Sequence, residues 1–132
     1  MKVSEIQRAF GHRLIGTRLM KRMVVTALRR MPDKTIEKVT KHCWFVSSFE
    51  DGWAFTLRHN DLKKGEFMIF LSDELLQEDE NQIIWTITHE IGHVILGHRN
   101  AIGVVQSKAE IRKQEKEADE FAIRLLRDRG ES

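Results

Sequence analysis

The chain has 132 residues, of which 41% are hydrophobic and 32% are charged. This length supports one hydrophobic core, so we expect a single domain over residues 1–132. The lone cysteine, Cys43, excludes an internal disulfide and the zinc sites that need several thiolates. Lys2 and Glu5 stand where an apolar export signal would begin, and no apolar run is long enough to cross a bilayer. We therefore expect a cytoplasmic protein with no membrane partner.

The net charge of +2 is unevenly distributed along the chain. Residues 1–42 carry eleven Lys or Arg and three Asp or Glu, whereas residues 43–132 carry eleven and seventeen, giving charges of +8 and −6. A basic segment can contact nucleic acid, but it can equally be the solvated face of a helix. These basic residues do not alternate with aromatic residues, and no nucleic-acid-binding motif accompanies them. We therefore favour the solvated helix face and expect no direct contact with nucleic acid.

Residues 1–42 have the apolar spacing of amphipathic helices. Apolar side chains recur at intervals of three and four residues up to Pro32, and Gly11 and Gly16 can bend or break the helix. Beyond the proline, residues 33–41 predict a second short helix. We expect a basic helical segment here.

Residues 43–72 change to a β pattern. Residues 43–49 and 53–57 are rich in aromatic and β-branched side chains, and the Glu-Asp-Gly sequence at 50–52 is a turn signal, which together predict a hairpin. Residues 66–71 are apolar enough for a third strand. We therefore predict a small, twisted, antiparallel sheet of about three strands.

Two more helices are predicted in the C-terminal part. Apolar periodicity indicates one helix over residues 80–97, which ends near Gly97. Ser107 and Glu110 form a capping-box pattern at the start of another amphipathic helix, over residues 107–128. The predicted fold class is α+β.

The first of these helices contains the sequence His-Glu-Ile-Gly-His. Four residues of helix place His89 and His93 on one face, one turn apart, which is a spacing that can chelate zinc. Glu90 lies about 100° around the helix from His89, so it can act as a base for water beside the metal without being a ligand. A motif this short can arise by chance, and a second signal is needed.

The second signal is an acidic pair on the following helix. Glu115 and Asp119 are one turn apart, so one of them can reach the metal while the other accepts a hydrogen bond from a ligand imidazole. Two histidines and one carboxylate leave the fourth position of zinc for water and substrate, as catalytic sites require.

Residues 66–126 resemble the ImmA/IrrE family of metallopeptidases, which is similar to the wider gluzincin group with its HExxH and ExxxD helices. The resemblance includes an apolar strand at 67–71, the helix entry at 84–88, the histidine motif at 89–93 and the acidic segment at 115–122. A minimal gluzincin of the membrane-protease lineage is an alternative relative, because the ExxxD pattern alone does not distinguish the two families. The family's Leu-Met-Pro ending is replaced here by Leu-Leu-Arg at 125–127.

The resemblance implies a role for each residue of the motif. His89, His93 and Glu115 are then the zinc ligands, Glu90 is the catalytic base, and Asp119 is the hydrogen-bond partner of His89. The implied fold is zincin-like, with a sheet edge that aligns an extended peptide, and the implied substrate is a helix-turn-helix transcriptional repressor.

Glu117 is a rival third ligand, but no acid follows it one turn later, so Glu115 is favoured. His98 does not fit a three-histidine HExxHxxGxxH pattern, which would need histidine one residue later. We expect His98 to be a helix-end residue that is solvated or binds a terminal carbonyl.

The chain has no Tyr to donate a hydrogen bond to the developing oxyanion, and His12, His42, His59 and His98 are the remaining imidazoles. We predict a zinc-dependent endopeptidase. The alternatives are a zincin-fold regulator that binds a repressor with little or no catalysis and, less favoured, a nucleic-acid-binding module. Cleavage that depends on Glu90 separates the first two.

Overall fold

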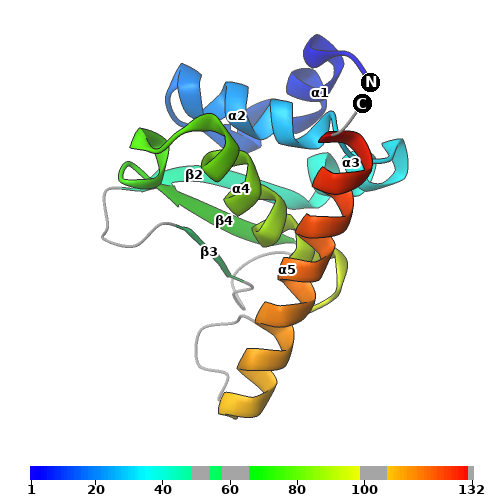
Figure 1. The fold of residues 1–132 in the computed structure, drawn as a ribbon. Helices are drawn as coiled ribbons and strands as arrows, with labels where there is room; N and C mark the ends of the chain where they lie inside the picture. Colours follow the sequence, from blue (N-terminus) through cyan, green and yellow to red (C-terminus); the bar gives the residue numbers. More distant parts are fainter. Residues whose placement is uncertain (49–53, 58–65, 99–106, 131–132) are drawn as a thin grey trace.

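The computed structural model describes residues 1–48, 54–57, 66–98 and 107–130. These residues form an α+β fold in which helices predominate and pack against one small sheet (Figure 1). The turn predicted at 50–52, His59 and the connector at 101–106 lie outside the described residues, as do Phe49 and Trp53, the predicted ends of two strands.

The N-terminal segment contains three helices rather than one long helix and a short one. They are α1 (Val3–Phe10), α2 (Arg18–Leu28) and α3 (Asp33–His42). A single 3-10 turn (Gly11–Arg13) and the short strand β1 (Leu14–Ile15) separate the first two. The chain thus breaks in the segment between the two glycines, as the sequence allows.

The sheet has four strands in the order β1-β2-β4-β3. Strand β2 (Cys43–Ser48) pairs in parallel with β1 and with β4 (Phe67–Ser72), whereas β3 (Ala54–Leu57) pairs with β4 in the antiparallel direction. The prediction of an antiparallel sheet is therefore wrong in part, because two of the three pairings are parallel.

The predicted hairpin between β2 and β3 is also wrong, because β4 lies between them. The chain does reverse direction between β2 and β3, as a turn signal predicts, but a reversal does not make two strands neighbours. Strand β4 is an apolar segment without Pro or charge, and it can therefore pair along both of its edges.

One face of the sheet belongs to the hydrophobic core. Cys43 and Phe45 of β2 and Ile69 and Leu71 of β4 are each fully buried, and the residues between them are only half-buried. This alternation is the period-two pattern of a strand covered on one side. Helices α1, α2 and α3 contribute many of the other core residues.

Helix α4 (Glu80–Ile95) lies against α2 and beside β3 (Figure 1). A 3-10 turn (Leu75–Gln77) precedes it, and the side chain of Asp79 caps it by accepting a hydrogen bond of 2.9 Å from the Gln82 amide. Helix α4 has buried residues on more than one face, which explains why apolar residues are so frequent in its sequence.

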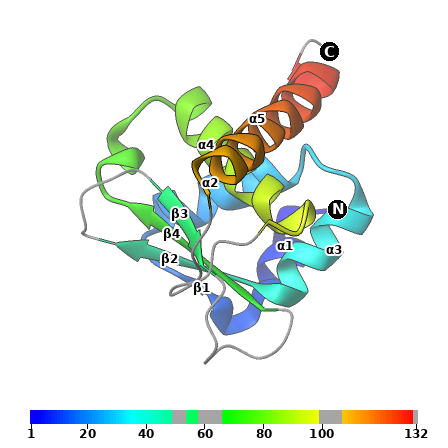
Figure 2. The ribbon, with the colours of Figure 1, turned by 90° about the horizontal axis from the view of Figure 1, so that it is seen from below.

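Helix α5 (Lys108–Gly130) runs alongside α4 (Figures 1 and 2). The amide of Glu110 donates a hydrogen bond of 3.1 Å to the Ser107 hydroxyl, which caps the helix as the sequence indicates. A narrow stripe attaches α5 to the body: Ala118 and Ala122 are fully buried, while most of its other described side chains are exposed. Small residues at this contact let the two helices approach closely.

Within the described parts of the chain, no helix combines the length and the apolar character that crossing a bilayer would require.

Candidate metal centre

Helix α4 presents His89 and His93 on the face that meets α5. Their Nε2 atoms lie 3.2 Å apart, and their rings meet edge to face with centroids separated by 4.8 Å. The side chain of His93 is only 2% exposed and that of His89 is 13% exposed, so the pair is largely shielded from solvent. One helical turn between the two residues produces this alignment.

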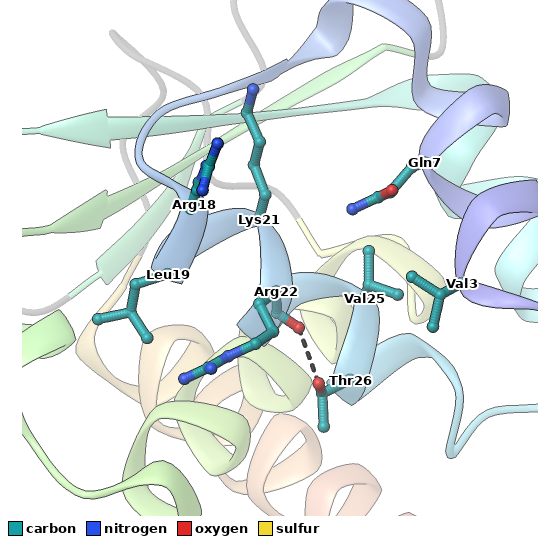
Figure 3. Close-up of a pocket in the computed structure, with 8 residues that line it drawn as sticks. All are labelled: Val3, Gln7, Arg18, Leu19, Lys21, Arg22, Val25 and Thr26. Carbon is teal, nitrogen blue, oxygen red and sulfur yellow. Dashed lines mark hydrogen bonds between the residues drawn. The ribbon is translucent and has the colours of Figure 1, made fainter.

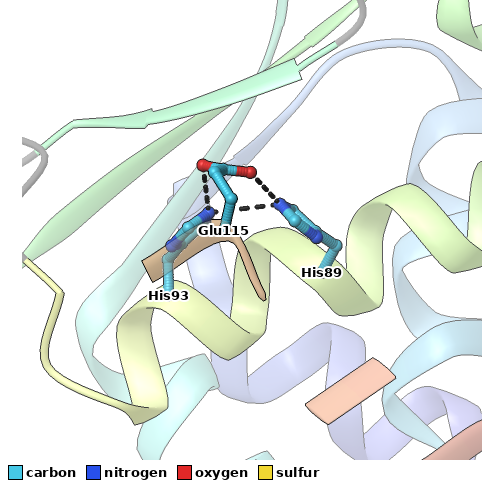
Figure 4. A group of neighbouring side chains, drawn as sticks. All are labelled: His89, His93 and Glu115. Atoms are coloured by element: carbon cyan, nitrogen blue, oxygen red, sulfur yellow. Dashed lines mark hydrogen bonds and ion pairs between the residues drawn. The ribbon is translucent and has the colours of Figure 1, made fainter. Parts of the chain in front are cut away.

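Glu115 of α5 completes the cluster. One carboxylate oxygen lies 2.9 Å from Nε2 of His89 and the other lies 3.1 Å from Nε2 of His93. Figure 4 shows both imidazoles rising from α4 toward this carboxylate. Potential ligand atoms of the three residues all lie within 4.8 Å of one another.

Asp119 stands one turn beyond Glu115 and contacts the other side of His89. Its Oδ1 lies 2.8 Å from Nδ1 of that imidazole. When Nδ1 is protonated, it donates a hydrogen bond to this carboxylate, and Nε2 keeps a free lone pair that points at the cluster. The acidic pair therefore contacts both nitrogens of His89.

Glu90 is buried beside the cluster, with a side chain that is 8% exposed. Its Oε2 lies 3.8 Å from Nε2 of His89, on the same side as Glu115. This carboxylate therefore lies next to the Nε2 atom of His89, one of the three potential ligand atoms. At this distance it can reach a water molecule held there.

His98 is buried, so of the two alternatives expected for it, a solvated side chain or one bound to a terminal carbonyl, the first is wrong. Its Nδ1 lies 2.8 Å from Nδ1 of His93, while its Nε2 lies 3.5 Å from Oε1 of Glu117. Glu117, the rival third ligand, therefore faces His98, and Glu115 is the glutamate that the structure brings to the two motif histidines.

Sequence reasoning missed the contact between His98 and His93, although a signal for it exists. Glycine after a helix often begins a Schellman motif, in which the next residue packs against the residue five positions before it. Gly97 is that glycine, and His98 is the next residue.

Burial lowers the pKa of His93 from its ordinary value of 6.5 to about 4. The nearby carboxylate of Glu115 acts in the opposite direction, and the neighbouring imidazoles of His89 and His98 reinforce the lowering. His93 is therefore neutral at physiological pH, and a neutral imidazole is the form that binds metal.

His12 and Cys43 lie outside this cluster. His12 packs edge to face on Trp44, with ring centroids 5.2 Å apart. Cys43 is fully buried, and burial raises the pKa of its thiol to about 12, so it is a core residue and not a nucleophile.

A groove of about 540 Å³ lies on the surface formed by α1 and α2 (Figure 3). Its lining combines basic with apolar side chains, among them Arg18, Lys21 and Leu19, and contains no residue of the cluster.

The cluster has the donor set and the spacing of a metal site. Zinc bonds of about 2.0–2.1 Å place the ligand atoms of a tetrahedral site about 3.3 Å apart. The separations of 3.2, 2.9 and 3.1 Å among His89, His93 and Glu115 are slightly shorter, so a small outward movement of these side chains admits an ion. The residues present therefore fit a divalent metal.

A family model described as Peptidase U49 matches residues 81–132. The matched segment begins in α4 and extends through α5, so it contains the whole cluster, but it is less than half of the chain. The match supports a peptidase, which is a hydrolase of peptide bonds, and does not specify the ImmA/IrrE family. No match is found among curated proteins or among solved structures.

Proposed function

We propose that this chain is a zinc-dependent endopeptidase with a zincin-like fold. The observation that carries the proposal is the convergence of His89, His93 and Glu115 from two helices, inside the segment that matches a peptidase family. Two imidazoles and one carboxylate form a ligand set of hydrolytic zinc sites, in which the fourth position stays open. The inert thiol of Cys43 argues against a cysteine peptidase.

Each residue has a role in the proposed hydrolysis. His89, His93 and Glu115 would hold zinc, which supplies a Lewis acid that makes water a nucleophile near neutral pH. Glu90 takes the proton of the attacking water and returns it to the leaving amine. Asp119 holds His89 in the tautomer whose Nε2 can bind the metal.

Strand β3 is the proposed binding edge for the substrate. It is the edge strand of the sheet next to β4, and it lies beside α4. An extended peptide can add to such an edge through backbone hydrogen bonds, which would carry the scissile bond past the metal centre. We infer from the resemblance to the ImmA/IrrE family that the substrate is a cytoplasmic helix-turn-helix repressor.

The test is cleavage of a defined protein. The zinc-loaded chain would be incubated with the helix-turn-helix repressor encoded nearest to its gene, and the products resolved by mass. We expect discrete fragments, loss of cleavage with a chelator, recovery on adding zinc, and no cleavage by Glu115→Gln. Binding without cleavage would instead support the regulator, which the absence of Tyr favours.

A further inference from the structure

The end of helix α4 brings His98 back against His93. The amide of Gly97 donates a hydrogen bond of 3.2 Å to the Val94 carbonyl, and the amide of His98 donates one of 2.9 Å to the His93 carbonyl. Gly97 has φ 70°, a left-handed conformation that favours glycine. These features define a Schellman motif, in which the side chains of His98 and His93 are expected to touch.

The two imidazoles do touch, and through their Nδ1 atoms, which lie 2.8 Å apart. The His93 and His98 side chains are 2% and 6% exposed, so water does not easily replace this contact. At such a distance one Nδ1 is protonated and donates a hydrogen bond, and the other Nδ1 accepts it.

Metal binding fixes the direction of this hydrogen bond. If Nε2 of His93 binds a metal, its proton stands on Nδ1, which then donates to Nδ1 of His98. Neutral His98 must in turn carry its own proton on Nε2. That Nε2 is buried and has no hydrogen-bond partner among the residues that the structure describes, but Oε1 of Glu117 lies 3.5 Å from it.

We propose that His98 is the positioning residue of His93, and that Glu117 positions His98. The inference rests on the metal site of the proposed function. Glu117 contacts Nε2 of His98, and Nδ1 of His98 contacts Nδ1 of His93. Asp119 contacts Nδ1 of His89 in the same way. The contact with His98 sets the tautomer and ring rotation of His93, and it places His98 on the side of that ring away from the metal, so His98 does not supply the oxyanion donor.

The experiment compares zinc affinity, measured by competition with a chelator, in three proteins. His98→Phe keeps a ring but has no acceptor, so we expect a loss of about 10- to 100-fold relative to the unaltered chain. His98→Asn offers an amide oxygen near the position of Nδ1, and we expect it to recover most of that loss. A merely space-filling role would predict the reverse order for these two variants.

Glu117 is tested in the same way with a matched control on the same helix. Glu117→Ala should weaken zinc binding by a smaller factor than His98→Phe, because it removes only the partner of His98. Glu120→Ala should leave the affinity unchanged, since Glu120 is an exposed acid of α5. Equal effects of the two alanine variants would overturn the role of Glu117.

Two spectroscopic measurements complete the test. With cobalt in place of zinc, the absorption bands of the metal should shift in His98→Phe and return in His98→Asn. In the unaltered zinc-loaded chain, nitrogen NMR should find the proton of His93 on Nδ1 and that of His98 on Nε2, which needs no variant to fold. A proton on Nδ1 of His98 would overturn the proposal.

The outcomes separate this inference from the proposed function. If the unaltered chain binds no zinc, both fail. If it binds zinc through Glu115 but His98→Phe has the same affinity and the same cobalt spectrum, only the positioning role fails.

Discussion

The ring of Phe121 on α5 lies directly against Gly92 on α4. A Cβ added to Gly92 would stand 2.9 Å from Cδ1 and 3.3 Å from Cβ of Phe121. Ring rotation can relieve the first contact, but the Cβ of Phe121 is fixed to the backbone of α5. Glycine at position 92 therefore sets the spacing between the helix that carries His89 and His93 and the helix that carries Glu115.

Gly92→Ala should lower zinc affinity and thermal stability together. Alanine ordinarily stabilises a helix interior by about 0.5–1 kcal/mol relative to glycine, but here it would push α5 away from α4. Zinc competition and thermal unfolding measure the two effects. Adding Phe121→Ala should restore part of the zinc affinity, because it removes the two ring carbons nearest to the new Cβ and leaves only the contact of 3.3 Å with the Cβ of residue 121. A more stable Gly92→Ala protein with unchanged zinc affinity would contradict this account.

The helices of the site could be predicted because their signals are local. The periodic apolar residues of α4 and the Ser107 cap of α5 lie within one or two turns of what they specify. The sheet could not be predicted as well, because strand order depends on pairing between segments distant in sequence. The two residues of β1 are too few to form a recognisable pattern. The turn signal between β2 and β3 predicted that the chain reverses direction, but it could not predict that β4 would pair between these two strands.

The same distinction applies to the metal centre. The one-turn pairs His89/His93 and Glu115/Asp119 each follow from helical geometry, and the structure places them together. The contact between His98 and His93 was missed because it depends on the left-handed conformation of Gly97, which turns the backbone back over the end of the helix.

Removing one imidazole should remove the metal. Protein purified without added metal is expected to contain near one zinc per chain by elemental analysis, and His93→Ala should contain almost none, because two ligands hold zinc far more weakly than three. His42→Ala is the control, since His42 lies outside the cluster. Unchanged zinc content in His93→Ala would refute the assignment.

Glu115 and Glu117 of α5 can be distinguished by replacing each of them with glutamine. Glu115→Gln should weaken zinc binding much more than Glu117→Gln, because only the first faces both Nε2 atoms of the cluster. Asp119→Ala should cost about 10- to 100-fold in affinity, as for other partners of ligand histidines. A stronger effect at Glu117 than at Glu115 would reverse the ligand assignment.

The metal-free protein should lose stability as the pH falls from 6.5 toward 4. Burial lowers the pKa of His93 from 6.5 to about 4 in the folded chain, so the unfolded chain binds more protons within this window. The free energy of unfolding therefore rises with pH there. Denaturant unfolding in the presence of a chelator would show a shallower pH dependence for His93→Gln, and parallel curves for the two proteins would argue against the lowered pKa.

Glu90→Gln should separate binding from chemistry. Its carboxylate lies beside the cluster, with Oε2 3.8 Å from Nε2 of His89, but it is not one of the three residues whose ligand atoms converge. Glutamine is close to glutamate in shape, so zinc content and repressor binding should survive, whereas the amide cannot take the proton of the attacking water. The variant should thus trap a substrate that the unaltered protein cuts. Zinc analysis, a binding assay and product masses would be measured on both proteins, and equal cleavage by the two would exclude Glu90 as the base.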